Sequence, residues 1–252
     1  MCELFGFTSA KPTDIRDYLR TFYTHSIEHP HGWGLMYEDG QRHVVKEAGC
    51  ASNSMFLDDL IESIPPQTAT LAHIRFATVG SINIKNCHPF TGKDNSGREW
   101  TMIHNGTIFN GRHNHRYSAV QAGNTDSERF FLFLMDTVNE HLGHSMKTER
   151  ERFEVISRFI SENAPRNKLN LMIWDGDLLY VHKNLINTLC FKRLGDGLLF
   201  ATRPLDDGAW VPFPVAQVIA YKHGQEVYRG DRHKGEFIPS LEYVNAMNAM
   251  HI

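Results

Sequence analysis

The stretch from residue 169 to 221 decides the fold, and it reads LNLMIWDG (169–176), DLLYVHK (177–183), TLCFKRL (188–194), GLLFATRP (197–204) and VAQVIAY (215–221). These apolar runs are punctuated by Asp175-Gly176 and Asp196-Gly197, and such dipeptides are typical of tight turns. Short strands joined by tight turns predict an antiparallel sheet. We expect the whole series to form one sheet, the second of the molecule.

The chain before this stretch contains an earlier set of strands, which we predict at residues 2–7, 32–37, 42–47, 68–76 and 100–104. Asp39-Gly40 tolerates positive φ and predicts a hairpin between the second and third of these strands. Pro12-Thr13-Asp14 is typical of a helix start, so a helix is expected from there to about Tyr23. A polar helix is expected over residues 54–63.

Two longer helices are predicted between the two sets of strands. Apolar residues recur on one face of each helix, at Phe130, Leu134 and Val138 in the first and at Phe153, Ile156 and Ile160 in the second. The order of sheet, helices and sheet predicts a layered α+β fold rather than a doubly wound α/β fold. The sequence contains no internal repeat or Pro/Gly-rich linker, so we expect one domain over residues 2–252.

The composition excludes several classes of protein. The 252 residues are 41% hydrophobic and 22% charged with a net charge of -3, so the chain has no basic field suited to nucleic acid. No apolar run approaches the roughly 18 residues of a membrane span, and the first residues lack the pattern of a signal peptide. We therefore expect a cytoplasmic protein. The 4 cysteines contain no CxxC pair, which argues against a disulfide framework or a zinc ribbon.

Cys2 is the first candidate for chemistry. Aminopeptidases remove Met1 when the next side chain is small, which would leave Cys2 with a free α-amine. An ordinary thiol has a pKa of about 8.5 and an α-amine one of about 8, so the amine can act as a general base for its own thiol. The alternative is that Cys2 is a small buried residue at the start of a strand.

Two strand ends carry further polar candidates. Arg75 ends the apolar strand in HIRFAT (73–78), where its guanidinium suits the carboxylate of a ligand or of an internal ion pair. Asn105 and Gly106 end another strand, and their side-chain and backbone N–H groups can bind an oxyanion together. Asn-Gly is also a common turn, so the two interpretations remain open.

Three loop segments complete the set of candidates. Asp126 lies in NTDSE (124–128), which has the composition of a helix cap and also offers a carboxylate to a ligand ammonium group. His88, in NCHPF (86–90), either lines a pocket or is a structural histidine. The clusters His113-Asn114-His115 and His25, His29 and His31 lack the spacing of zinc ligands, so no metal is expected.

Together, these segments resemble the class II glutamine amidotransferase domain of the N-terminal nucleophile superfamily. Cys2, HIRFAT (73–78), NCHPF (86–90), HNG (104–106) and TDSE (125–128) occur in the family's order and at similar separations. The opening CELFGF (2–7) with HGWG (31–34) looks most like the stand-alone YafJ-type members. The resemblance spans nearly the whole chain and implies a four-layer αββα sandwich, the Ntn-hydrolase fold.

The resemblance also implies a role for each matching residue. Cys2 would attack the γ-carboxamide of glutamine, and Asn105 with Gly106 would hold the oxyanion. The substrate zwitterion would be recognised by opposite charges, with Arg75 on its α-carboxylate and Asp126 on its α-ammonium group. Thr78 and His88 would lie close to the substrate. Water would then resolve the γ-glutamyl thioester, and no cofactor is implied.

Two departures from the family leave the final reaction open. Glu3 and Phe76 stand where synthase members often carry Gly and Trp, and synthases have a second domain that consumes the ammonia. We therefore expect either an amidotransferase subunit that delivers ammonia to a separate synthase or a free-standing hydrolase of glutamine or a γ-glutamyl conjugate. A non-catalytic amino-acid-binding protein is the alternative from a different class, and retention of Met1 would favour it.

Overall fold

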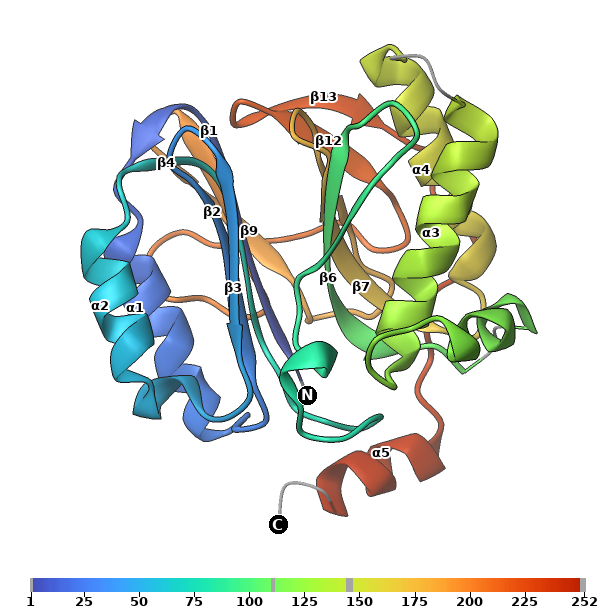
Figure 1. The fold of residues 1–252 in the computed structure, drawn as a ribbon, viewed down its shortest axis with the longest axis horizontal. Coiled ribbons are helices and arrows are strands. Elements are labelled where there is room, and N and C mark those ends of the chain that lie inside the picture. Colours follow the sequence, from blue (N-terminus) through green and yellow to red (C-terminus); the bar gives the residue numbers. More distant parts are fainter. Residues whose placement is uncertain (1, 110–111, 144–146, 250–252) are drawn as a thin grey trace.

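The computed structural model describes residues 2–109, 112–143 and 147–249, without the side chains of 112–114 and 246–248. Two antiparallel sheets lie face to face, with helices on their outer faces (Figure 1). No helix in the described part of the chain is both long and apolar enough to span a bilayer.

The first sheet is formed around the N-terminal strand. Its strand order is β11-β9-β10-β1-β4-β2-β3. The strands run over β1 (Glu3–Thr13), β2 (Trp33–Glu38), β3 (Arg42–Glu47), β4 (Gln67–Ile74), β9 (Cys190–Leu194), β10 (Gly197–Ala201) and β11 (Val211–Pro212). β1 is therefore a central strand, hydrogen-bonded to β4 on one side and β10 on the other.

The second sheet carries the strands from the middle and the end of the chain. Its order is β13-β12-β8-β7-β6-β5. The strands are β5 (Phe90–Lys93), β6 (Glu99–Thr107), β7 (Lys168–Trp174), β8 (Leu179–His182), β12 (Ile219–Lys222) and β13 (Gln225–Arg229). β6 and β7 pair along their whole length, from Thr101 opposite Trp174 to Thr107 opposite Lys168.

Helices cover both outer faces and complete four layers. The helices α1 (Arg16–Thr24) and α2 (Met55–Ser63) contribute Leu19, Phe22, Leu57 and Ile61 to a core against the first sheet. The helices α3 (Asp126–Leu142) and α4 (Glu149–Asn163) pack on the second sheet through the expected apolar faces. A third core, with Leu4, Met172 and Phe200, fills the space between the sheets. The predicted αββα sandwich is confirmed.

The expectation that the whole strand series after residue 168 forms one sheet is wrong. β7, β8, β12 and β13 belong to the second sheet, whereas β10 pairs with β1 and β9 pairs with β10 in the first sheet. β10 is buried throughout, and a strand buried on both faces has apolar residues along its length, so its sequence carries no mark of the sheet that it joins. The earlier strand over residues 100–104 likewise belongs to the second sheet, as part of β6.

Local sequence signals explain the helix ends. Ser54 caps α2 by accepting a hydrogen bond from the Leu57 N–H, and Thr125 caps α3 in the same way from Glu128. Pro12-Thr13 continues β1 instead of starting a helix, and α1 begins only at Arg16. A last helix, α5 (Leu241–Ala249), lies apart from the sandwich, below the end at which the N-terminus is found (Figure 1).

Candidate active site

Cys2 lies half-buried at the start of β1, beside the end of β4. Its sulfur accepts a hydrogen bond from the Phe76 N–H at 3.3 Å and lies 3.4 Å from the Phe76 carbonyl oxygen. Burial raises the pKa of the Cys2 thiol, and the Phe76 backbone together with the charges of Lys168 and Arg75 opposes that rise. Burial is the larger effect, and the neighbouring cations and the Phe76 N–H offset part of it.

Asn105 and Gly106 belong to the other sheet. They lie near the end of β6, and both are fully in the ladder, opposite Asn170 and Leu169 of β7. A Cβ atom at position 106 would collide with the Lys168 carbonyl oxygen and the His104 ring, so the site requires glycine. The alternative that Asn-Gly forms a turn is wrong, since both residues lie within a strand.

Lys168 is a site residue that the sequence analysis missed. Its ammonium group is buried, with the residue 1% exposed, and donates a hydrogen bond to Asn105 Oδ1 at 3.1 Å. Burial lowers the pKa of Lys168 to about 8, and the charge of the nearby Cys2 sulfur opposes this shift. With Oδ1 accepting this bond, the Asn105 amide N–H₂ is left to donate to a substrate. No spacing in the sequence links Lys168 to Cys2, because the two meet across the sheets.

Arg75 is buried next to Cys2. Its guanidinium donates hydrogen bonds to the carbonyl oxygens of Val79 at 2.9 Å, Gly80 at 3.3 Å and Ser81 at 3.0 Å. Among the described residues, no carboxylate forms an ion pair with it, so the alternative of an internal ion pair is wrong. Arg75 thus shapes the loop that follows β4, and this loop carries the exposed Thr78.

Asp126 stands at the first position of α3. One carboxylate oxygen accepts the Ile108 N–H at 2.7 Å. Asp126 therefore holds the backbone just after β6, close in sequence to Asn105 and Gly106. Thr125, not Asp126, caps the helix. Ser127 of the same segment lies 2.9 Å from His104 Nδ1. The segment therefore combines a helix cap with a buried carboxylate near Asn105 and Gly106.

His88 is buried, with 3% of its surface exposed. Its ring packs against His73, with ring centroids 4.1 Å apart and the two planes tilted by 37°. Neither of its ring nitrogens has a partner among the described residues. Burial keeps the pKa of His88 well below its usual value, and the neighbouring histidines act in the same direction. The ring is therefore neutral and belongs to the interior between the sheets, next to the His73 contact to the His104 carbonyl oxygen.

Glu3 organises the histidines near the thiol. His25 Nδ1 lies 2.8 Å and His29 Nε2 3.3 Å from its carboxylate, and Arg203 pairs with the same group at 2.9 Å. His31 instead accepts the Ala77 N–H at 2.9 Å.

Within the described residues, no group of three or more His, Cys, Asp or Glu side chains is arranged to hold a metal. The cluster at 113–115 lies partly outside the described side chains.

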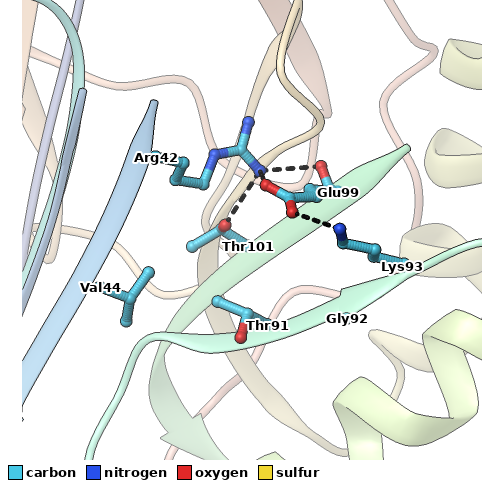
Figure 2. Close-up of a pocket in the computed structure, with 7 residues that line it drawn as sticks. All are labelled: Arg42, Val44, Thr91, Gly92, Lys93, Glu99 and Thr101. Carbon is cyan, nitrogen blue, oxygen red and sulfur yellow. Dashed lines mark hydrogen bonds and ion pairs between the residues drawn. The ribbon is translucent and has the colours of Figure 1, made fainter. Parts of the chain in front are cut away.

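A cavity at the sheet edges lies apart from these residues (Figure 2). It has a volume of about 210 Å³ and is lined by Arg42 and Val44 of β3 and by residues of β5 and β6. Its charges are already paired, because Arg42 donates to the Glu99 carbonyl oxygen at 2.9 Å and Lys93 pairs with the Glu99 carboxylate at 3.0 Å. The residues around Cys2 therefore remain the candidate active site, and this cavity is separate from them.

Comparison with known proteins agrees with this geometry. The sequence profile of the family described as glutamine amidotransferases class-II matches residues 1–194, and this range includes Cys2, Arg75, Asn105 and Asp126. The chain belongs to the class II glutamine amidotransferases.

Two relatives in sequence share about a quarter of the aligned residues with the chain. YafJ of Escherichia coli is 28% identical over 191 residues, covering 70% of this chain and 70% of YafJ. An uncharacterized protein of Methanocaldococcus jannaschii is 25% identical over 260 residues, covering 92% of this chain and 72% of that protein. Among solved structures, glutamine phosphoribosylpyrophosphate amidotransferase from B. subtilis superposes with a TM-score of 0.68 at 14% identity, covering 92% of this chain and 50% of that one.

Proposed function

We propose that this chain hydrolyses γ-glutamyl amides, with glutamine as the simplest substrate, and that Cys2 is the nucleophile after removal of Met1. The observation that supports the proposal most strongly is the position of Lys168, whose ammonium group donates to Asn105 Oδ1 and acts electrostatically on the Cys2 sulfur. Lys168 thereby links the thiol to the strand end that carries Asn105 and Gly106, and a thiol with oxyanion donors is what acyl transfer from an amide requires.

The steps follow from these positions. The Cys2 α-amine takes the thiol proton as the sulfur attacks the carbonyl carbon of the γ-carboxamide, and the resulting oxyanion is held by the Asn105 side-chain N–H and the Gly106 backbone N–H. The C–N bond then breaks, the amine leaves with a proton supplied through the Cys2 α-ammonium group, and a γ-glutamyl thioester remains. Water attacks the thioester, releasing glutamate and restoring the thiol.

We assign substrate recognition to Arg75 and Asp126, with Thr78 and His88 near the bound molecule. Arg75 would exchange some of its bonds to the 79–81 carbonyl oxygens for the α-carboxylate, which would couple binding to the position of that loop. Asp126 would bind the α-ammonium group with the oxygen that does not hold the Ile108 N–H.

We further propose that residues 2–252 act as one glutamine amidotransferase type-2 domain. β10, β12 and β13 lie beyond residue 194 and complete both sheets. If ammonia is transferred and not released, its acceptor would be a separate synthase subunit.

The test is release of glutamate from glutamine and from γ-L-glutamyl methylamide by the wild type and by Cys2→Ala. We expect Cys2→Ala to lose all activity and retain its fold, and Cys190→Ala, at another half-buried thiol, to match the wild type. Wild-type rates in Cys2→Ala would refute the mechanism. Binding of glutamine without hydrolysis by a protein that lacks Met1 would favour the binding-protein alternative.

A further inference from the structure

An aromatic cavity lies at the same end of the sandwich as the candidate active site. It has a volume of about 430 Å³ and is lined by Phe109, Phe237 and Tyr243, with Arg166, Glu236 and Ser240. The Phe109 and Phe237 rings stack with centroids 5.9 Å apart, and Tyr243 meets both edge-on, at 5.9 Å and 5.4 Å. The three rings form one continuous aromatic wall.

The position of this cavity follows from the strands that carry the site. Phe109 comes three residues after Gly106, so their Cα atoms are at most about 10 Å apart. Arg166 comes two residues before Lys168, which lies opposite Thr107 in the β6–β7 ladder. The cavity therefore opens directly at the end of the two strands that hold Asn105, Gly106 and Lys168.

The C-terminal segment brings the third ring toward the thiol. Asn184 anchors this segment by donating to the Gly235 carbonyl oxygen at 2.8 Å and accepting the Phe237 N–H at 2.8 Å. α5 follows and carries Tyr243. Burial raises the pKa of the Tyr243 phenol, and the charge of the Cys2 sulfur raises it further. Tyr243 is therefore within electrostatic reach of the nucleophile.

Ammonia does not account for a cavity of this size. An ammonia molecule is about as large as water, which occupies roughly 30 Å³ in the liquid. The cavity of about 430 Å³ is many times larger, and its rings offer apolar faces that ammonia does not use. A planar ring on the leaving amine, in contrast, would pack against Phe109, Phe237 and Tyr243 by offset or edge-on contacts.

We propose that the cavity binds the amine side of the substrate and that this side is aromatic, so that the preferred substrates are γ-glutamyl amides of arylalkyl amines. The inference rests on the proposed function, because it places the ring on the leaving side of the bond that Cys2 cleaves. The released products are glutamate and the arylalkyl amine, and the amine takes the proton that ammonia would take.

The test compares γ-L-glutamyl benzylamide with γ-L-glutamyl methylamide, whose amines are both alkyl amines and differ by the ring. We expect kcat/KM for the benzylamide to be higher by roughly tenfold or more, the range that one added apolar contact supplies in specific pockets. Free benzylamine should inhibit the reaction at lower concentrations than methylamine does. Equal values for the two substrates would overturn the inference.

Two variants test whether the preference for the benzylamide arises from the aromatic cavity. Phe109→Ala and Tyr243→Ala should each reduce the ratio of benzylamide to methylamide activity toward one. Phe109 is 54% exposed, so its truncation leaves the core intact. The matched control is Phe56→Ala on α2, where the ring is 53% exposed and remote from the cavity lining, and this variant should keep the wild-type ratio. An unchanged ratio in both cavity variants would overturn the inference.

Failure of the inference and failure of the proposed function give different results. If the wild type hydrolyses both amides equally and Cys2→Ala hydrolyses neither, the assignment of Cys2 as nucleophile is supported and the aromatic amine-binding site is refuted. If Cys2→Ala retains activity, or if the wild type hydrolyses neither amide nor glutamine, the proposed function is refuted, and the inference about the aromatic site is refuted with it.

Discussion

The buried ammonium group of Lys168 is held at 3.1 Å from Asn105 Oδ1 and acts electrostatically on the Cys2 sulfur. We assign Lys168 as a positioning residue that orients the Asn105 amide and favours the thiolate of Cys2. Lys168→Met should slow alkylation of Cys2 by 6-diazo-5-oxo-L-norleucine by about a hundredfold, the lower end of the effect of losing an oxyanion donor.

The pH dependence distinguishes this role from a purely structural one. Because burial lowers the pKa of Lys168 to about 8, its charge is present below that pH and is lost above it. The ratio of wild-type to Lys168→Met rates should be largest below pH 8 and should fall above it. Lys183→Met is the control, since Lys183 is also buried but binds the Leu189 carbonyl oxygen. A constant ratio across pH 6 to 10 would contradict the assignment.

Glu3 makes the fold sensitive to acid. Burial opposes its ionisation, but hydrogen bonds to His25 and His29 and the charge of Arg203 outweigh burial and lower the pKa of Glu3 from 4.5 to about 2. This stabilisation is complete above pH 4.5 and is lost as the pH falls to about 2. The difference of 2.5 units corresponds to about 3 kcal/mol, so Glu3→Gln should lower the free energy of unfolding by about that amount at pH 7. Denaturant titrations at pH 7 and pH 2.5 measure the difference, which should shrink at the lower pH.

At the scale of elements, β6 depends on the absence of a side chain at Gly106. An added Cβ would collide with the Lys168 carbonyl oxygen of the paired strand, and a backbone atom cannot rotate away. Gly106→Ala should therefore abolish hydrolysis and lower the melting temperature by several degrees, a loss of about 2 kcal/mol or more. Gly92→Ala on β5 is the control, because its Cβ would meet only side chains, at 3.3 Å and beyond. Wild-type activity in Gly106→Ala would contradict this account of β6.

The elements themselves were largely predictable from local patterns. The hairpin at Asp39-Gly40, the capped helix at Ser54 and the apolar faces of α3 and α4 rest on signals within a few residues of one another. The split of the late strands between two sheets was not predictable in the same way. β10 pairs with β1 across some 190 residues of sequence, and fully buried strands do not differ in composition between the two sheets.

The same contrast holds for the site. Cys2, Arg75, Asn105 and Asp126 stand in motifs that resemble a family, whereas Lys168 and Tyr243 have no motif and reach the site only through tertiary contacts. The burial of His88 was also not predictable, because NCHPF gives no sign that the ring packs against His73. Sequence patterns thus indicated the chemistry, and the fold added the residues that position it.

At the scale of the molecule, the two sheets share one core, so the sandwich should unfold as a unit. Met172 is fully buried in this core, and Met172→Ala should cost about 2–5 kcal/mol of unfolding free energy. The loss should appear equally in tryptophan fluorescence and far-UV circular dichroism, as a single transition. Met55→Ala, at an 81% exposed position, should change the free energy by less than about 0.5 kcal/mol. Two separated transitions in Met172→Ala would show that the sheets unfold independently.

The most direct test of the central claim is the intact mass of the protein before and after incubation with 6-diazo-5-oxo-L-norleucine, followed by peptide mapping. We predict a protein that lacks Met1 and gains a single adduct on Cys2, with Cys50, Cys87 and Cys190 unmodified. A protein that lacks Met1 and takes no label at Cys2, or takes it on another cysteine, would contradict the assignment of Cys2 as the nucleophile.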